Sequence, residues 1–315
     1  RYGMSDDARK KLNPEDLSRM NLEQIKPLED IFCNCMKNKT ALVTGGASGL
    51  GYMVVNRLCE AGARVVIASR GEERGKRAVK DLTEKGYEVS WVQTDVSKVD
   101  SCYGAVDFTV KTYGGLDILV TSAAGWSSYS FLDLPEEVYD RVLDVDLKGS
   151  YFMGQAAARY MVANKVKGHI VFISSAAHMG EGPVGLGMNS YYAAAKAGVV
   201  AMTKTVSGEL RQYGIHVNCV APGGMLSAGV FTEGTEAFAL YGPEYKEVRD
   251  AHSRDIPLAM NPDMVALVVF AMCTPMADFM QGETVDVNGG TLMITQERPF
   301  SFTVEGCIPG PQSKM

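Results

Sequence analysis

A tyrosine and a lysine four residues apart, Tyr192 and Lys196, are the side chains of this sequence best placed for proton chemistry. Residues at i and i+4 share one face of a helix, so the phenol and the ammonium can meet in one site. A neighbouring positive charge favours the phenolate and brings the pKa of a phenol down from about 10 toward neutrality. Ser174 and Ser175, which end an apolar run, could add a hydroxyl. Such a set could exchange a proton with a carbonyl or alcohol oxygen.

A glycine-rich segment, residues 44–51 (Thr-Gly-Gly-Ala-Ser-Gly-Leu-Gly), follows the apolar run Ala-Leu-Val and precedes a helical pattern. In this setting Gly45 permits a tight turn, Gly49 lets the backbone approach a pyrophosphate, and Gly51 allows the helix to pack closely on the strand. The helix N-terminus then offers N–H groups and a positive dipole end to phosphates. The sequence therefore predicts a dinucleotide-binding turn. The residues assigned to it are Gly45, Ser48, Gly49, Leu50 and Gly51.

The second strand of the pattern ends in Ser69 and Arg70, where a site for NAD(H) usually places an acid that receives the ribose hydroxyls. An arginine there can pair with a 2′-phosphate instead. These two residues favour NADP(H) as the cofactor. NAD(H) stays possible because Glu72 and Glu73 follow closely.

The elements that must position these residues alternate between short β-branched runs and longer amphipathic segments. This pattern predicts an α/β fold with a doubly wound, Rossmann-type parallel sheet of about seven strands, flanked by helices. The single catalytic domain is predicted over 37–295, with an N-terminal helical extension at 1–36, a lid or substrate loop at about 224–261 and a C-terminal tail at 296–315. The predicted strands are 40–44, 64–68, 89–93, 116–121, 168–174, 215–220 and 283–287, and the predicted helices are 49–61, 72–85, 100–113, 136–163, 190–213 and 262–273.

The composition excludes several classes of protein. A chain of 315 residues with 46% hydrophobic content can bury a large single core. The formal charge of −6 and the lack of a basic run argue against nucleic acid or an anionic membrane as the main partner. The seven cysteines are scattered and lack the spacing of a zinc site, so we expect no metal, reduced thiols and a cytoplasmic location. No run of 18 apolar residues and no targeting segment is recognised.

Five motifs occur in order over residues 37–295 and resemble those of the short-chain dehydrogenase/reductase family. They are the glycine turn at 44–51, Asp95-Val96, Tyr192-x-x-x-Lys196, Asn218-x-Val220-x-Pro222-Gly223 and Val287-Asn288-Gly289-Gly290. The resemblance implies an NAD(P)(H)-dependent enzyme that interconverts a ketone and a secondary alcohol.

The resemblance also implies roles for particular residues. Tyr192 would be the general acid/base, Lys196 would hold the nicotinamide ribose and lower the tyrosine pKa, and Ser175 rather than Ser174 would orient the carbonyl. The other cofactor contacts implied are Asp95 and Val96 near the adenine, Ala123 after the fourth strand, and Pro222 and Gly223 near the nicotinamide. Members of the family commonly pair through long helices, here 136–163 and 190–213, so a homodimer or homotetramer is expected.

The sequence departs from the family pattern at three places. The helix asparagine that usually anchors a water for proton relay is Asp146, which we include among the catalytic candidates because an acid could still hold the water. Its charge could also shift the pH optimum. The usual Asn-Asn-Ala-Gly is replaced by residues 121–125 (Thr-Ser-Ala-Ala-Gly), and Met225, Leu226 and Ser227 stand where a threonine often follows Pro-Gly.

Aromatic and methionine side chains on loops near the expected nicotinamide end suggest an apolar, ring-containing ketone as substrate, steroid-like or isoflavanone/flavonoid-like. An alternative is that several of them only seal the lid or a subunit contact. A rival activity is that of an NADPH-dependent enoyl- or dienoyl-thioester reductase, suggested by Ala68-Ser69-Arg70 and by Ala123-Ala124-Gly125. A third possibility is a catalytically degenerate nucleotide-binding regulator. The candidate substrate residues are Trp126, Tyr129, Phe131, Met179, Met188, Phe231 and Tyr241.

Overall fold

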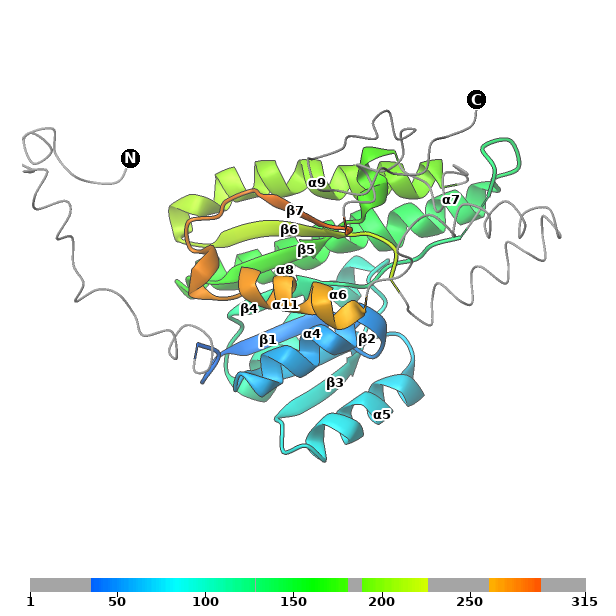
Figure 1. Ribbon diagram of the computed structural model, residues 1–315. Helices are drawn as coiled ribbons and strands as arrows, with labels where there is room; N and C mark the ends of the chain where they lie inside the picture. Colours follow the sequence, from blue (N-terminus) through cyan, green and yellow to red (C-terminus); the bar gives the residue numbers. More distant parts are fainter. Residues whose placement is uncertain (1–34, 128, 181–188, 226–260, 290–315) are drawn as a thin grey trace, which may run out of the picture.

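The computed structural model describes residues 35–127, 129–180, 189–225 and 261–289. Its centre is one seven-stranded sheet of strand order β3-β2-β1-β4-β5-β6-β7, in which every neighbouring pair is parallel (Figure 1). The strands are β1 (Thr40–Thr44), β2 (Arg64–Ser69), β3 (Val89–Gln93), β4 (Ile118–Thr121), β5 (His169–Ile173), β6 (His216–Pro222) and β7 (Thr284–Val287).

The central strands are apolar on both faces because helices cover both faces of the sheet. All residues of β1 and of β4 are buried, and Leu42 lies beside Val66 and Leu119 in the register. β-Branched residues fit this doubly covered position because their stiff side chains pack well on a pleated surface. The core therefore continues through the sheet from one helical layer to the other.

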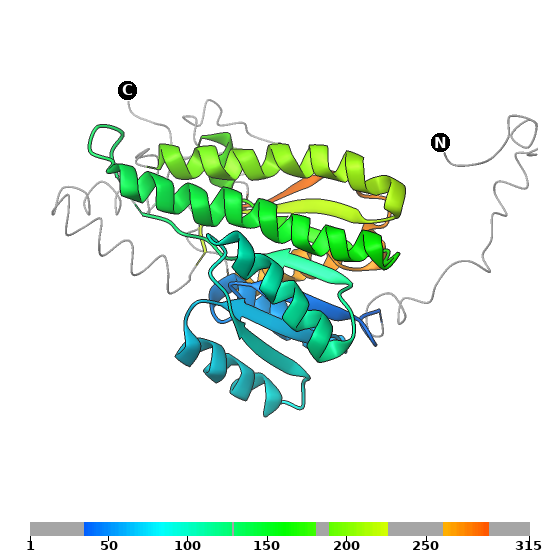
Figure 2. The ribbon, with the colours of Figure 1, turned by 180° about the vertical axis from the view of Figure 1, so that it is seen from behind.

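In the described part of the chain, three helices cover one face of the sheet and three cover the other. α4 (Gly49–Glu60), α5 (Glu72–Thr83) and α11 (Pro262–Met272) pack in one hydrophobic cluster, and α4 and α11 lie side by side in Figure 1. α6 (Val99–Tyr113), α8 (Gly149–Ala163) and α9 (Ser190–Leu210) lie on the opposite face, seen in the ribbon of Figure 2, and pack in the other cluster. The structure is thus the single-domain, Rossmann-type sheet that the sequence predicted.

The predicted strands and helices are present with ends shifted by a few residues, but the predicted helix 136–163 is not one regular helix. It is divided into α7 (Glu136–Leu143), a π-helical segment Asp144–Lys148, and α8. π-Helical turns are rare, occur mostly as short insertions within α-helices, and are frequent at functional sites. The amphipathic pattern could not reveal this one because a π turn keeps the chain helical and adds no breaking residue.

Most of the predicted extension 1–36, the lid 224–261 and the tail 296–315 lie outside the described residues. No helix in the described ranges is long and apolar enough to cross a membrane.

Candidate functional site

Many of the predicted site residues follow strands at the carboxyl edge of the sheet. β1 leads into the glycine turn, β4 into residues 122–127, β5 into Ser174 and Ser175, and β6 into Gly223. The order of strands reverses between β1 and β4, which lie side by side although β2 and β3 intervene in the chain. Such a switch point is where open α/β sheets bind ligands.

The glycine turn is packed so closely that side chains do not fit at two of its positions. Gly45 and Gly49 have φ of +67° and +55°, in the left-handed region that favours glycine. A Cβ on Gly45 would lie 2.8 Å from the nitrogen of Ala123, and a Cβ on Gly51 would lie 2.4 Å from the carbonyl oxygen of Gly45. Thr44 Oγ1 also accepts a hydrogen bond of 3.1 Å from the Ala123 nitrogen. This bare backbone cradle at the start of α4 fits a dinucleotide pyrophosphate.

The end of β2 carries the residues predicted to choose between NAD(H) and NADP(H). Arg70 is exposed, and the indole Nε1 of Trp91 donates a 2.9 Å hydrogen bond to Ser69 Oγ. Glu72 pairs with Lys76 at 2.5 Å, and this partner lowers the pKa of the Glu72 carboxyl. Sequence reasoning missed Trp91 because nothing local distinguishes it from any other residue of a strand.

The two residues predicted to lie near the adenine, Asp95 and Val96, follow β3. Asp95 Oδ1 accepts hydrogen bonds from the nitrogen of Ser97 at 3.1 Å and from its Oγ at 2.8 Å. Val96 is buried, and a Cβ on Gly149 would lie 2.9 Å from its Cγ2, so the start of α8 packs closely on this turn.

The two serines after β5 have different surroundings. Ser174 is buried and its hydroxyl donates to the carbonyl oxygen of Lys196 at 2.9 Å, so it helps to hold α9 on the sheet. Ser175 is half-buried and caps a 3-10 turn, because its Oγ accepts a 3.2 Å hydrogen bond from the Ala177 nitrogen. His178 in that turn faces Asp286 Oδ1 at 3.1 Å, which links the turn to β7. This link spans 108 residues and no local pattern could predict it.

Tyr192 and Lys196 lie on α9, as the four-residue spacing predicted. The Lys196 Nζ is 5.5 Å from the centre of the Tyr192 ring and donates to the carbonyl oxygen of Ile173 at 3.1 Å. Ile173 immediately precedes the serine pair, so the ammonium ties α9 to the end of β5. The structure thus brings the predicted phenol, ammonium and Ser175 to one end of the sheet.

Asp146 also reaches this cluster, from the π-helical segment. Its Oδ1 lies 2.8 Å from Lys196 Nζ, and its Oδ2 accepts a 2.8 Å hydrogen bond from the Gly125 nitrogen. The side chains of Asp146 and Lys196 are 0% and 2% exposed. Burial raises the pKa of Asp146, although the nearby Lys196 acts in the opposite direction. Burial by itself would lower the pKa of Lys196, but the Asp146 carboxylate outweighs this effect and the pKa of Lys196 is raised. The lysine is therefore an ammonium at neutral pH.

The predicted substrate residues are dispersed. Trp126 is half-buried, and Tyr129 packs in a small cluster that includes Tyr192. Phe131 and Met179 are 82% and 50% exposed. Met188, Phe231 and Tyr241 lie outside the described residues.

Tyr191, which sequence reasoning did not single out, supports the loop after β4. It is buried, and its hydroxyl donates to the carbonyl oxygen of Ser127. Arg141 Nη2 reaches Ser127 Oγ at 3.2 Å. The only sequence signal for Tyr191 was that it directly precedes Tyr192. Consecutive residues of a helix point to different faces, so this signal did not place the two tyrosines in one site.

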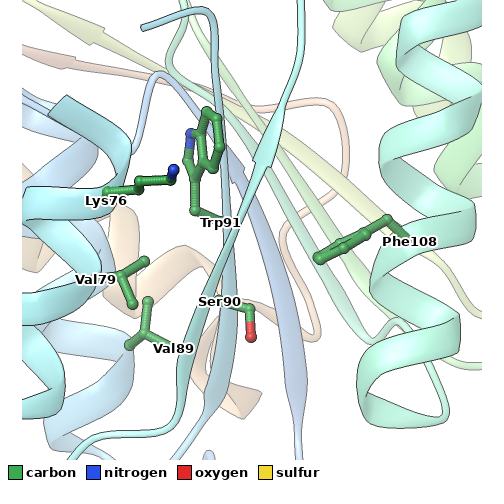
Figure 3. Close-up of a pocket in the computed structure, with 6 residues that line it drawn as sticks. All are labelled: Lys76, Val79, Val89, Ser90, Trp91 and Phe108. Carbon is green, nitrogen blue, oxygen red and sulfur yellow. The ribbon is translucent and has the colours of Figure 1, made fainter. Parts of the chain in front are cut away.

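A separate cavity of about 350 Å³ lies at the edge strand β3 (Figure 3). Its lining contains no predicted catalytic residue, so we do not assign the reaction to it. Among the described residues, no group of three or more His, Cys, Asp or Glu could hold a metal ion. The residues that line the cavity are Lys76, Val79, Val89, Ser90, Trp91 and Phe108.

Comparison with known proteins finds relatives in sequence and in fold. The family model for short chain dehydrogenases matches residues 39–236. Dehydrogenase/reductase SDR family member 4 of Bos taurus is 34% identical over 260 residues, covering 82% of this chain and 89% of the relative. Galactitol 2-dehydrogenase of Agrobacterium fabrum is 32% identical over 263 residues, covering 82% of this chain and 99% of the relative. The crystal structure of an actinorhodin polyketide ketoreductase variant with NADPH has a TM-score of 0.73 at 29% identity and covers 80% of this chain and 96% of that chain.

The fold, the ordered motifs and these similarities agree on one family and on its reaction class. The chain belongs to the short-chain dehydrogenase/reductase family and is an NAD(P)(H)-binding oxidoreductase that acts on alcohol and ketone groups of small molecules.

Proposed function

We propose that this protein is an NADP(H)-dependent reductase that converts a bulky, apolar ketone, such as a steroid-like or isoflavanone/flavonoid-like compound, into a secondary alcohol. The observation that carries the proposal is the placement of Tyr192 beside the buried Lys196 ammonium, at the same end of the sheet as the half-buried Ser175. Bound NADPH would supply the hydride. The glycine cradle at 45–51 would hold its pyrophosphate, with Pro222 and Gly223 at the nicotinamide end.

The roles of the side chains follow from the charge that develops on the carbonyl oxygen. When a hydride adds to the carbonyl carbon, the oxygen becomes negative and needs hydrogen-bond donors at once. The Ser175 hydroxyl would donate to that oxygen, and Tyr192 would deliver its proton to it. Lys196 stabilises the phenolate that remains because its positive charge lies beside the ring.

The preference for NADP(H) rests on the end of β2. Arg70 is exposed and offers a guanidinium for a 2′-phosphate, while Glu72 is engaged by Lys76. An unpaired acid at this place would repel the phosphate, but the Glu72 charge is balanced along its own helix. The exposed Arg70 therefore favours NADP(H), and because Glu73 also follows it, NAD(H) is the alternative outcome of a cofactor comparison.

The preference for an apolar substrate rests on Trp126 and Tyr129. Both follow β4 and are half-buried, and Tyr129 packs in the same cluster as Tyr192. A ring-containing ketone would bury its apolar surface against such side chains. The names of the relatives include both a sugar-alcohol dehydrogenase and a polyketide ketoreductase, so the choice of substrate depends on these aromatic residues.

The test is a measurement of NADPH and NADH oxidation with steroid, isoflavanone and other aryl ketones, and with enoyl- and dienoyl-CoA thioesters. Ketone-dependent oxidation that falls at least about 100-fold in Tyr192→Phe would support the proposal. The matched control is Tyr151→Phe, which makes the same change at a tyrosine that is 45% exposed on α8 and should keep full activity. Activity with thioesters alone would replace the proposal with double-bond reduction. Binding of NADPH without turnover of any substrate would favour a nucleotide-binding regulator.

We also propose that the protein is a homodimer or homotetramer. α8 and α9, which belong to the two segments expected to pair, lie side by side on one face (Figure 2). Light scattering coupled to size-exclusion chromatography would measure the mass, and a monomer at micromolar concentration would contradict the proposal.

A further inference from the structure

The contacts of Asp146 suit a carboxylate at this position. One of its oxygens faces the Lys196 ammonium and the other accepts from the Gly125 nitrogen, so both neighbours are hydrogen-bond donors. A carboxylate offers two acceptor oxygens, whereas an asparagine amide offers one oxygen and two N–H donors. An asparagine here would turn its NH₂ group toward one of the donors. The local geometry therefore accounts for the acid that stands where the family usually has an amide.

The backbone around Asp146 is shaped to bring it to Lys196. The π-helical segment widens the helix at this point, and Ser150 Oγ donates to the carbonyl oxygen of Asp146 at 2.7 Å. On α9 a Cβ added to Gly198 would lie 2.9 Å from Cδ1 of Leu147, so the two helices approach closely two residues beyond the lysine. This packing excludes solvent from the pair, whose side chains are 0% and 2% exposed.

The carboxylate is the charge that balances the Lys196 ammonium. The other titratable groups that act on Lys196 are Tyr192, on its own helix, and Cys219 on β6. Burial raises the pKa of Cys219 to about 11, so this thiol is neutral at physiological pH. Gly125 contributes only the dipole of its N–H group to Asp146. The ammonium beside Tyr192 thus forms half of a neutral pair, and its effect on the phenol is weaker than that of an isolated charge.

We propose that Asp146 is a positioning residue that fixes Lys196 by a direct ion pair and, by offsetting its charge, raises the pH at which Tyr192 exchanges its proton. This inference rests on the proposed role of Tyr192 as the proton donor. Its consequence is a more alkaline pH dependence than the same Tyr-Lys arrangement would give with a neutral residue at 146. Asp146 also links Lys196 to the loop after β4 through Gly125.

The test measures the pKa of Tyr192 in the Asp146→Asn variant. Tyrosinate absorbance is recorded as a function of pH, without substrate or cofactor. The chain has 14 tyrosines, so each titration is taken as the difference between a protein and its Tyr192→Phe counterpart. Removing the buried negative charge should lower the tyrosine pKa by about one unit or more. The matched control is Asp144→Asn, which removes the same charge from the same π-helical segment at an exposed position paired with Lys148, and should leave the titration unchanged.

An unchanged or upward-shifted Tyr192 titration in Asp146→Asn would overturn the proposal. If that variant does not fold, the double variant Asp146→Asn/Lys196→Met removes both charges of the pair. A neutral pair predicts that the Tyr192 pKa rises by less than about one unit in the double variant. A larger rise would show an unbalanced ammonium in the native protein and would overturn the proposal. Neither titration needs a ketone, so a failure of ketone turnover and a failure of this inference are separate results. Where a substrate is found, the pH profile of kcat/KM should move in the same direction as the tyrosine pKa.

Discussion

Substituting Gly51 by alanine should impair cofactor binding by forcing the glycine turn apart. The added Cβ would lie 2.4 Å from the carbonyl oxygen of Gly45 and 2.7 Å from its carbonyl carbon. A comfortable carbon–oxygen contact is about 3.4 Å, so the start of α4 must move by about 1 Å relative to the turn. Overpacking of this kind costs about 1–3 kcal/mol of stability. Losing one charge-assisted hydrogen bond to a phosphate costs about 1.5–3 kcal/mol, which is roughly a 10- to 150-fold rise in Kd.

The assay is a titration of NADPH by fluorescence, together with thermal unfolding of the free protein. The matched control is Gly104→Ala on α6, where an added Cβ meets no heavy atom within 4 Å. That variant should bind NADPH normally and gain up to about 1 kcal/mol from better helix propensity. A Gly51→Ala protein that binds NADPH within about threefold of the native protein would refute the close-packing argument.

Three further predictions concern the cofactor choice, the core and the pH dependence of folding. Arg70→Ser should raise the KM for NADPH at least about tenfold and leave the KM for NADH nearly unchanged, and equal effects on both would contradict the 2′-phosphate assignment. Gly154→Ala should lower the free energy of unfolding by about 1–3 kcal/mol, because the added Cβ would lie 2.7 Å from Cζ of the buried Phe172. Urea denaturation measures this loss, and an unaltered midpoint would show that the core rearranges to accept the methyl group. Burial and the neighbouring His216 lower the pKa of His169 to about 4 in the folded protein, compared with about 6.5 in the unfolded chain. The neutral imidazole therefore contributes its full stabilisation above a pH of about 6.5, and this contribution is lost as the pH falls from about 6.5 toward 4. Between pH 7 and pH 5 the free energy of unfolding should fall by about 2 kcal/mol more in the native protein than in His169→Gln. Equal falls in the two proteins would disprove this role of His169.

The sequence alone determined the features that depend on short stretches of chain. Alternating apolar runs and amphipathic segments predicted the seven strands and the helices between them, because the periods of strand and helix are local properties. The glycine spacing at 44–51 predicted the turn before α4, and the four-residue spacing predicted that Tyr192 and Lys196 share α9. Each of these inferences needs only neighbours within one or two turns of chain.

The tertiary structure decided which residues meet across the chain. Asp146 contacts Lys196 and Gly125, and these three residues come from three different elements or loops. Its reach depends on a π-helical turn that leaves no mark in the amphipathic pattern. The sequence could show that an acid replaced an amide, but not that two donors would face it. That arrangement arises only when packing of α9 against the π-helical segment and the loop after β4 brings both donors to one buried point.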